Sequence, residues 1–244
     1  MEKKWFVALL MVVVMMCACW TGAVADEERK TFTSGDYQYA LLDDGTVEIA
    51  GYKGSADLLA IPAELDGKAV TSIGDCAFYL CSSLTSVSIP DSVEQIGTNP
   101  FAACFELKTI SVSPEHPYFA TIDGVLFRKA DKALISYPAS ISSSTYTIPQ
   151  GITSIGDSAF FYCDSLTSVS IPDSITSIGD SAFFWCSSLT SVSIPDSVTS
   201  IGDYAFAGCG SLTLTVPRNS YAAEYAKANN IPYTYPDAND WLNN

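Results

Sequence analysis

The sequence predicts an α/β, β-rich fold: a right-handed solenoid of about seven coils, in which short repeats stack into one elongated array. The first observation is self-similarity, because three nearly identical segments follow one another from Ile148, each opening on Ile-Pro and passing through Ser-Ile-Gly-Asp. The second is spacing: Ile148, Ile171 and Ile194 are each 23 residues apart. A fixed period of this length is typical of repeat proteins whose units cover one another's apolar faces.

The first half of each unit reads as a strand with one buried face. Leu166, Val169 and Ile171 have the L-x-x-L-x-L spacing that turns three apolar side chains inward from a strand and its entry. Pro172 then ends the ladder, because proline has no backbone N–H to donate. The residues between the apolar positions are expected to face outward: Thr167, Ser168 and Ser170.

The second half of the unit returns the chain to the next strand. Ile175 and Ile178 begin a second wall, and Gly179 supplies a permissive backbone. Asp180 is a candidate helix N-cap. We therefore expect a short helical turn whose inward face carries small, aromatic and thiol side chains: Ala182, Phe183 and Cys186.

Around these units the sequence predicts caps and an insertion. Asp43-Asp44-Gly45 marks a hairpin turn near the N-terminus, and an Ala-rich stretch from Tyr221 to Asn229 predicts a helix near the C-terminus. Apolar runs at 122–127 and 134–137 flank a polar turn, which predicts a protruding β-hairpin. The expected organisation is a signal peptide at 1–25, an N-terminal hairpin cap at 26–60, a solenoid at 61–217 with the insertion at about 113–147, and a C-terminal helical cap and tail at 218–244.

The first 25 residues have the composition of an export signal. Lys3 and Lys4 precede an apolar run from Phe6 to Trp20, and Ala23-Val24-Ala25 is an A-x-A cleavage site. We expect cleavage after Ala25 and an exported product, secreted or displayed on the cell surface. Acylation of Cys19, giving a lipoprotein, is the alternative. No second apolar span follows, so no transmembrane segment is expected in the mature chain.

Charge narrows the range of partners. The chain carries 27 acidic and 12 basic residues, a formal net charge of −15. An acidic surface repels phosphate backbones and anionic lipid headgroups, so nucleic acid and membrane surfaces are poor partners. Neither the ligand nor an oligomeric state follows from the composition.

The cysteines follow the repeat. Five of them stand three residues before the Leu of their unit, which indicates small apolar side chains at stacked core positions rather than a disulfide framework. Cys76 lies outside this pattern, and a link from Cys76 to Cys81 stays open. The five periodic residues are Cys81, Cys104, Cys163, Cys186 and Cys209.

Signatures of catalysis are weak, so we predict no enzyme. His116 is the single histidine, lies in Pro114-Glu115-His116-Pro117 without a nucleophile at a recognisable spacing, and reads as an exposed loop residue. The repeated aspartates read as turn and cap residues rather than paired catalytic carboxylates. No zinc spacing, phosphate-binding glycine motif or other cofactor signature is present, so we predict neither metal nor cofactor.

Two surfaces could bind a ligand. The first is the outward face of the strands, where hydroxyl side chains recur; strand propensity alone could explain them. The second is aromatic, at the two positions between the Phe and the Cys of each unit; such rings either stay exposed for a partner or pack on one another. The candidate hydroxyl residues are Thr167, Ser168, Ser170, Thr190, Ser191 and Ser193. The candidate aromatic residues are Tyr79, Phe161, Tyr162, Phe184 and Trp185.

The repeat also resembles a known family. The pattern I-P-x-S-[VI]-x-x-I-G-x-x-A-F-x-x-C-x-S-L, at Ile171 to Leu189, resembles the BspA-like, treponemal-type leucine-rich repeat of bacterial secreted and surface proteins. The resemblance covers about Asp36 to Pro217. It implies an exported or surface-displayed protein, in a family of which some members act as adhesins that bind host matrix proteins or other cells. Asn99-Pro100 departs from the pattern, and the repeat at 212–216 is one residue short.

These observations favour a secreted or surface-attached binding module that holds a protein or glycan ligand by surface complementarity. The alternative is a structural spacer or display scaffold of the cell envelope, without a ligand of its own.

Overall fold

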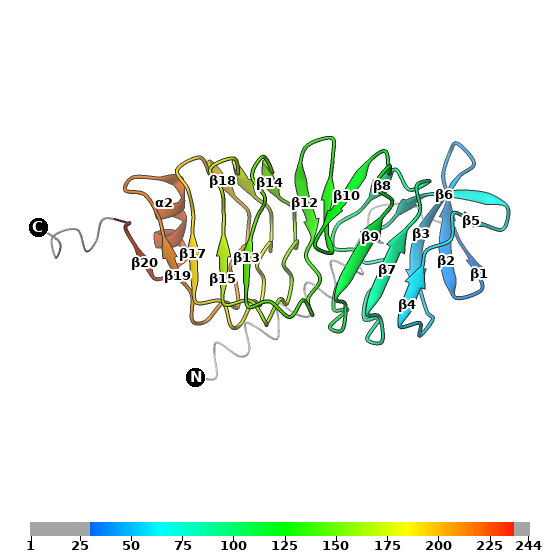
Figure 1. Ribbon diagram of the computed structural model, residues 1–244, viewed down its shortest axis with the longest axis horizontal. Helices are drawn as coiled ribbons and strands as arrows, with labels where there is room; N and C mark the ends of the chain where they lie inside the picture. The colour runs from blue at the N-terminus through cyan, green and yellow to red at the C-terminus, as the bar shows by residue number, and fades with distance from the viewer. Residues whose placement is uncertain (1–29, 237–244) are drawn as a thin grey trace, which may run out of the picture.

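The structure, a computed structural model, describes residues 30–236 and shows an elongated β-solenoid (Figure 1). Its turns lie side by side along the long axis, from antiparallel strands at one end (blue) to a helix at the other (orange-red). The described residues are β-rich and contain one α-helix. The segments predicted as a signal peptide and as the last part of the tail lie outside these residues, so the cleavage site after Ala25 and the alternative at Cys19 stay predictions.

The first wall of the solenoid consists of parallel strands, one per turn. They form a three-stranded sheet of β4 (Leu58–Ala60), β7 (Ser86–Ile89) and β9 (Thr109–Val112), and a five-stranded sheet of β13 (Thr145–Thr147), β15 (Ser168–Ser170), β17 (Ser191–Ser193), β19 (Thr213–Thr215) and β20 (Tyr233–Thr234). Val169 pairs with Val192 and Ser170 with Ser193, so residues of the same type lie next to each other in neighbouring turns. These strands define about eight turns, one more than expected, because β20 adds a turn after the helix.

The second wall is also built from parallel strands, four of which are only two residues long. Its members are β6 (Lys68–Ile73) and β8 (Gln95–Ile96) in the N-terminal half, and β12 (Ala133–Ser136), β14 (Ser154–Ile155), β16 (Ser177–Ile178) and β18 (Ser200–Ile201) in the C-terminal half. At the N-terminal end, β1 (Thr31–Ser34), β2 (Tyr37–Leu41) and β3 (Val47–Tyr52) form an antiparallel meander. β3 continues in parallel onto β6, which also pairs with β5 (Glu64–Leu65). The hairpin expected around Asp44 is therefore present.

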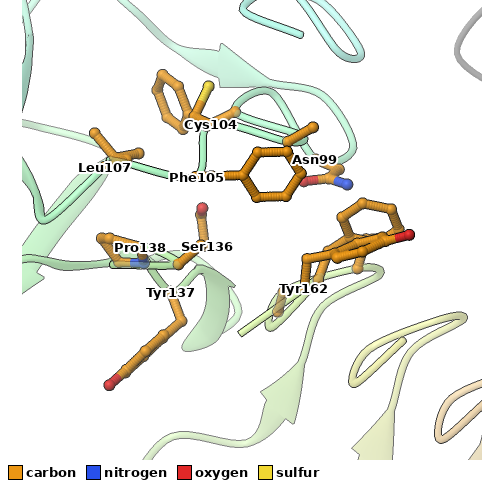
Figure 2. A pocket seen from close by; sticks show the side chains of 14 residues that line it. Asn99, Cys104, Phe105, Leu107, Ser136, Tyr137, Pro138 and Tyr162 are labelled. Atoms are coloured by element: carbon orange, nitrogen blue, oxygen red, sulfur yellow. The ribbon is translucent and has the colours of Figure 1, made fainter. Parts of the chain in front are cut away.

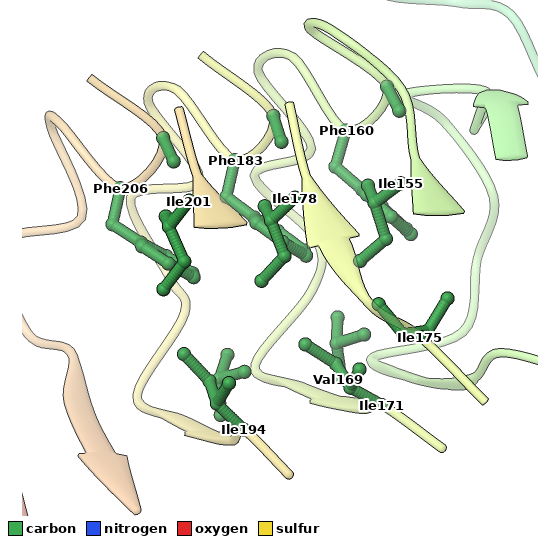
Figure 3. Packing of buried hydrophobic residues seen from close by; sticks show 14 of the residues in the cluster. Ile155, Phe160, Val169, Ile171, Ile175, Ile178, Phe183, Ile194, Ile201 and Phe206 are labelled. Carbon is green, nitrogen blue, oxygen red and sulfur yellow. The ribbon is translucent and has the colours of Figure 1, made fainter. Parts of the chain in front are cut away.

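The core between the walls is a set of stacked columns (Figure 3). Phe160 and Phe183 stack with ring centroids 4.7 Å apart, and Phe183 and Phe206 with centroids 5.0 Å apart. Isoleucines such as Ile155 and Ile178 form a second column beside the rings and are also buried. Each turn thus covers the apolar face that its neighbour leaves open, as the 23-residue period predicts.

The third side of each turn is not helical, which corrects the expectation of a short helical turn. We call this side the turn wall; it comprises residues 75–83, 98–106, 157–165, 180–188 and 203–211. Each segment has two residues at positive φ, such as Ser158 (φ 54°) and Tyr162 (φ 57°). Alternate amides donate to the following turn: Phe160 N to Ala182 O at 2.7 Å, and Tyr162 N to Phe184 O at 2.9 Å. A helix would use these amides inside the segment, whereas a stack in register offers acceptors outside it.

The repeated Gly-Asp pair joins one turn to the next, and Asp180 is not a helix N-cap. The Asp180 backbone N–H donates to Asp157 Oδ1 at 2.8 Å, and the Asp203 N–H donates to Asp180 Oδ1 at the same distance. A Cβ at Gly179 would meet Asp157 Oδ1 and would lie 2.6 Å from Asp157 N. Glycine is therefore required here by close approach of the neighbouring turn rather than by a positive φ.

The insertion contains the predicted antiparallel pairing, but it forms a layer within the stack instead of protruding from it. Its strands β10 (Phe119–Ile122) and β11 (Val125–Arg128) pair with each other, and β11 pairs with β12, which continues into β14. Successive side chains of β11 point to opposite faces: Leu126 is buried in the N-terminal core, and Val125 and Phe127 are buried in the C-terminal core. The apolar run looked like an exposed hairpin because periodicity does not show that both faces are covered.

His116 is buried, which corrects its interpretation as an exposed loop residue. Its Nδ1 accepts the backbone N–H groups of Tyr118 and Phe119, both at 3.2 Å, and its Nε2 lies 3.2 Å from Pro90 O. A nitrogen that accepts two N–H groups must be unprotonated, so Nε2 carries the hydrogen and donates to Pro90. Burial lowers the pKa of His116. Its role is to fix the start of the insertion.

The C-terminal helix lies where the sequence predicts it. α2 (Tyr221–Ala228) begins after Ser220, whose Oγ accepts the Ala223 N–H at 3.1 Å. Ala222, Ala223 and Ala226 are buried against the C-terminal core.

The departure from the repeat pattern at Asn99-Pro100 leaves the stack intact, because Phe78 N still donates to Pro100 O at 2.8 Å.

We expect Gly179→Ala to lower the free energy of unfolding by about 1–3 kcal/mol, because the new methyl group would overlap the Asp157 main chain. The control is Gly210→Ala in the same wall, where a Cβ would meet nothing within 4 Å. Urea unfolding of both variants measures the difference. Equal stabilities would contradict the close approach between turns.

We expect acid to destabilise the protein through His116. Its folded pKa is lowered, so below the unfolded value of about 6.5 the unfolded state takes up a proton that the folded state does not. Stability should therefore fall by up to about 1.4 kcal/mol per pH unit as pH drops below 6.5. The stability difference between the unmodified protein and His116→Asn, measured by urea unfolding from pH 7.5 to 5.5, isolates this contribution. A difference that does not change with pH would contradict it.

Candidate functional site

The predicted aromatic residues lie on the turn wall in two rows along the solenoid. The inner row contains Phe161 and Phe184, which stack with centroids 5.5 Å apart and an interplanar angle of 7°. Phe184 is buried, with 2% of its surface exposed, and Phe161 is half-buried. The inner row therefore belongs mainly to the packing of neighbouring turns, and Phe184 is not available to a partner.

The outer row is more exposed and is also stacked. Tyr162 and Trp185 lie parallel, with centroids 5.6 Å apart and an interplanar angle of 13°. On the far side of Trp185 lies Gly208, where a Cβ would be 2.7 Å from the indole ring. The ring faces are thus occupied along the solenoid axis, while both side chains stay half-buried. The ring faces that stack between Tyr162, Trp185 and Gly208 are therefore not open to a partner.

Phe105 completes this surface at the point where the insertion interrupts the turn wall. It is 46% exposed and meets Tyr162 edge to face, with centroids 5.7 Å apart. Figure 2 shows Phe105 and Tyr162 coming together from two separate turns, with Asn99 beside them and Tyr137 pointing away. The notch between them has room for about 10 Å³, roughly one water-sized group. The notch is therefore too small to hold a small-molecule ligand.

The same repeat position carries Leu80 in an earlier turn, and this side chain is 52% exposed. We call Leu80, Phe105, Tyr162 and Trp185 the apolar ridge. Leu80, Tyr162 and Trp185 all have φ between 57° and 58°, a left-handed conformation that costs a non-glycine residue about 1–2 kcal/mol. Gly208 shows that glycine fits this position, so the large side chains are not required by the backbone.

Sequence reasoning missed Leu80 and Phe105. Leu80 stands at the same repeat position as Tyr162, so alignment of the units by their Cys could have found it. Phe105 follows Cys104, where the other units carry Ser, Asp or Gly, and only the loss of a turn-wall segment at the insertion brings it against Tyr162.

Tyr79 lies beside Leu80, at the N-terminal end of the turn wall. It is half-buried and lines a pocket of about 210 Å³ together with Tyr52, Lys53 and Cys81. The turn that follows has only Ala102 and Ala103 at the two aromatic positions, so Tyr79 is separated from the stacked rings by one turn.

The hydroxyl rows on the first wall divide into two kinds. The threonines bond along the stack: Thr167 Oγ1 donates to Ser144 O at 3.0 Å, and Thr190 Oγ1 donates to Thr167 O at 3.1 Å. These two side chains satisfy the neighbouring main chain. The serines face outward instead; Ser170, Ser191 and Ser193 are exposed and Ser168 is half-buried. A flat row of identical small hydroxyls results.

A polar groove of about 480 Å³ runs along the second wall, across β8, β12, β14, β16 and β18. Gly156, Gly179 and Gly202 contribute backbone without side chains, and Asp157 and Asp180 line one side. These aspartates already bind the next turn through one oxygen. The groove borders the turn wall through these two aspartates, and Arg128 also lines it.

The periodic cysteines are free thiols, as predicted, and Cys81 therefore forms no link to Cys76. Cys104 Sγ donates to Phe78 O, and Cys186 Sγ to Phe160 O, each at 3.0 Å and each to the preceding turn. Burial and the neighbouring Cys163 thiol raise the pKa of Cys186. A buried thiol with a raised pKa is a poor nucleophile.

Other chemistry finds little support in the described part of the chain. Among residues 30–236, no group of three or more His, Cys, Asp or Glu side chains is placed to hold a metal ion. Within the same residues, no helical segment combines the length and the apolar character needed to cross a bilayer.

Comparison with known proteins places the repeat in a described family. The family model for the BspA type leucine rich repeat region matches residues 64–142 and 136–229, with six copies of the repeat. A search of curated proteins found no match to this chain.

Several solved structures are similar to this chain. A leucine-rich repeat protein from Eubacterium ventriosum is 21% identical, with a TM-score of 0.57 over 78% of this chain and 73% of that chain. A leucine-rich repeat protein from T. pallidum is 29% identical, with a TM-score of 0.40 over 77% of this chain and 72% of that chain. A leucine rich cell surface protein from Faecalibacterium prausnitzii is 22% identical, with a TM-score of 0.45 over 90% of this chain and 98% of that chain. The first of these similarities supports the solenoid.

We expect Cys186 in the folded protein to react with iodoacetamide at pH 8 at least about tenfold more slowly than in denaturant, because its pKa is raised and its sulfur is buried. Half-buried Cys81, whose pKa is lowered by its hydrogen bond with the Cys104 thiol, is the internal control and should react faster. Mass spectrometry of the alkylated peptides over time measures both rates. A Cys186 rate unchanged by denaturant would show that the thiol is accessible.

Proposed function

The chain belongs to the BspA-type leucine-rich repeat family, and from this premise we propose that it is an exported binding module that holds a protein or glycan ligand on the outside of its solenoid. The composition of the first 25 residues supports export. Repeat solenoids offer extended surfaces rather than enclosed sites, so binding by surface complementarity suits this architecture better than catalysis.

The observation that carries the proposal is the apolar ridge. Leu80 and Phe105 expose about half of their surfaces, and Phe105 contacts half-buried Tyr162, which stacks on half-buried Trp185. Exposed apolar side chains gathered on one face of a water-soluble protein mark an interaction surface. Aromatic side chains also dominate the energetic centres of protein interfaces.

The outward serines are the weaker candidate. Ser191 and Ser193 are exposed but small, and they offer hydroxyl groups that water satisfies equally well. Thr167 and Thr190 already donate to the neighbouring turn. The hydroxyl groups of the first wall therefore bond to the neighbouring turn or to water. The turn wall instead exposes apolar side chains, which water cannot hydrogen-bond.

A binding panel tests the proposal. The mature chain is immobilised and exposed to extracellular-matrix proteins and mucin, and the dissociation constant is measured for each. Tyr162→Ser with Trp185→Ser should weaken the observed binding at least about tenfold, as loss of interface aromatics does. The matched control is Ser168→Ala with Ser191→Ala, which changes two side chains on the other wall and should leave binding within about twofold.

Thermal unfolding of each variant checks that loss of binding does not reflect loss of fold. If the serine pair weakens binding and the aromatic pair does not, the ligand occupies the first wall. Absence of binding to every member of the panel would favour the alternative, a structural spacer of the cell envelope.

A further inference from the structure

We infer that the partner of the turn wall is a basic protein surface, one that places apolar side chains on the apolar ridge and lysines or arginines against the carboxylates around it. This inference rests on the proposed binding function and names the chemistry of its ligand. It follows from the charge of the wall, the orientation of its rings and the rigidity of its backbone.

The turn wall carries charge of one sign. Its five segments contain six acidic residues and no lysine, arginine or histidine. All six carboxylates are exposed. They are Asp75, Glu106, Asp157, Asp164, Asp180 and Asp203. Outside these segments, Lys53 lines the pocket beside Leu80. A patch that combines exposed apolar groups with a net negative charge is complementary to a basic apolar surface, and the same charge repels acidic proteins, nucleic acids and anionic lipid.

Two of these carboxylates flank the ridge directly. Glu106 follows Phe105 in the chain, and Asp164 follows Cys163, two residues after Tyr162. Asp164 Oδ1 accepts both the Ser187 N–H at 3.1 Å and the Ser187 hydroxyl at 2.8 Å. These bonds hold the side chain in place through Oδ1, and the residue itself is exposed. A lysine or arginine of a partner can bind the carboxylate without reorganising the wall.

The orientation of the rings favours a protein over a glycan. Sugars bind aromatic side chains through the ring face, and cations also prefer the face. Trp185 has Tyr162 on one face and Gly208 on the other, and Tyr162 lies between Trp185 and Phe105. Ring edges and the exposed leucine are left for contact. Apolar side chains of a partner protein can pack on these exposed groups, while its lysines or arginines bind the carboxylates.

The wall is already in its binding shape. Amides of Phe160, Tyr162 and Trp185 donate to neighbouring turns at 2.7 to 2.9 Å, so the segments that carry the ridge are held on both sides. Leu80, Tyr162 and Trp185 occupy left-handed positions for which glycine would be the relaxed choice. Side chains projected from a rigid, locally strained backbone lose little freedom on binding, which favours recognition of a folded partner.

Three synthetic amphipathic helical peptides test the inference against the full mature chain. One combines leucine and lysine, the second combines leucine and glutamate, and the third keeps the lysines but replaces the leucines with serine. We expect the leucine–lysine peptide to bind at least about tenfold more tightly than either of the others, because the wall requires both apolar contact and positive charge.

Variants of the wall locate the binding. Leu80→Ser with Phe105→Ser removes exposed apolar groups, and Glu106→Gln with Asp164→Asn removes two charges while keeping the acceptor that Ser187 uses. Each pair should weaken the leucine–lysine peptide at least about tenfold, and the charge pair should also reduce the salt dependence of binding. The matched controls are Leu58→Ser with Tyr221→Ser, both exposed elsewhere, and Asp173→Asn with Asp196→Asn, both exposed at the Pro-Asp turns.

Each outcome decides the inference. Loss of binding in the wall variants but not in the controls, with unchanged melting temperatures, supports it. Equal loss in wall and control variants, equal affinity for the glutamate peptide, or equal affinity for the serine peptide overturns it. A matrix protein or mucin bound by the panel but insensitive to Glu106→Gln with Asp164→Asn would overturn the basic partner and leave the binding function standing. Absence of any ligand in that panel would remove the binding function itself.

Discussion

Each turn of this protein is held to the next by hydrogen bonds that join equivalent positions one period apart. Asp180 N donates to the carboxylate of Asp157, and Thr190 Oγ1 donates to the carbonyl of Thr167. A residue in such a stack must therefore form a favourable contact with the same residue type in the next turn. Aspartate does so through a carboxylate oxygen that accepts a hydrogen bond from the next amide, and threonine through a hydroxyl group that donates to a neighbouring carbonyl. Phenylalanine does so because flat rings stack about 5 Å apart. The side-chain repertoire of the repeat follows from this requirement.

The insertion interrupts that self-complementarity and has consequences at some distance along the chain. β11 and β12 supply side chains to both halves of the core, so the stack stays closed although the main sheet is divided between β9 and β13. At β13, which the division leaves without a parallel neighbour on one side, Ser143 Oγ donates to Thr145 O at 2.6 Å and satisfies that carbonyl group. On the turn wall the interrupted segment is replaced by Phe105 leaning onto Tyr162. Phe105, Tyr162 and Trp185 are therefore in contact along the wall, whereas Leu80 is followed at its own repeat position by Ala103.

The period, the inward positions and the C-terminal helix could be predicted from the sequence because each depends on local spacing or on a cap. Phe183 and Leu189 are buried as the pattern required. The non-helical backbone of the turn wall could not be predicted in the same way, because hydrogen bonds to a neighbouring turn leave no pattern in the sequence of one unit. The Gly-Asp pair also resembles the start of a helix. The burial of His116 could not be predicted for a related reason: its two N–H donors lie nearby in the chain, but its third partner, the Pro90 carbonyl, lies 26 residues away. Site residues were found only where they repeated; Phe105 did not.

The contrast between the two walls decides which of them can specify a partner. On the first wall, Ser168 lies opposite Ser191 and Ser170 opposite Ser193, so a ligand moved by one turn meets the same groups again. Such a surface gives no preferred position along the axis. On the turn wall the backbone repeats equally well, but one position carries Leu80, Tyr162, Trp185 or Gly208 in different turns. Specificity is a difference between the affinities of alternative arrangements, and only an aperiodic surface provides that difference. The regular stack makes the protein rigid, and the varied side chains of the turn wall can determine where a ligand binds along the axis.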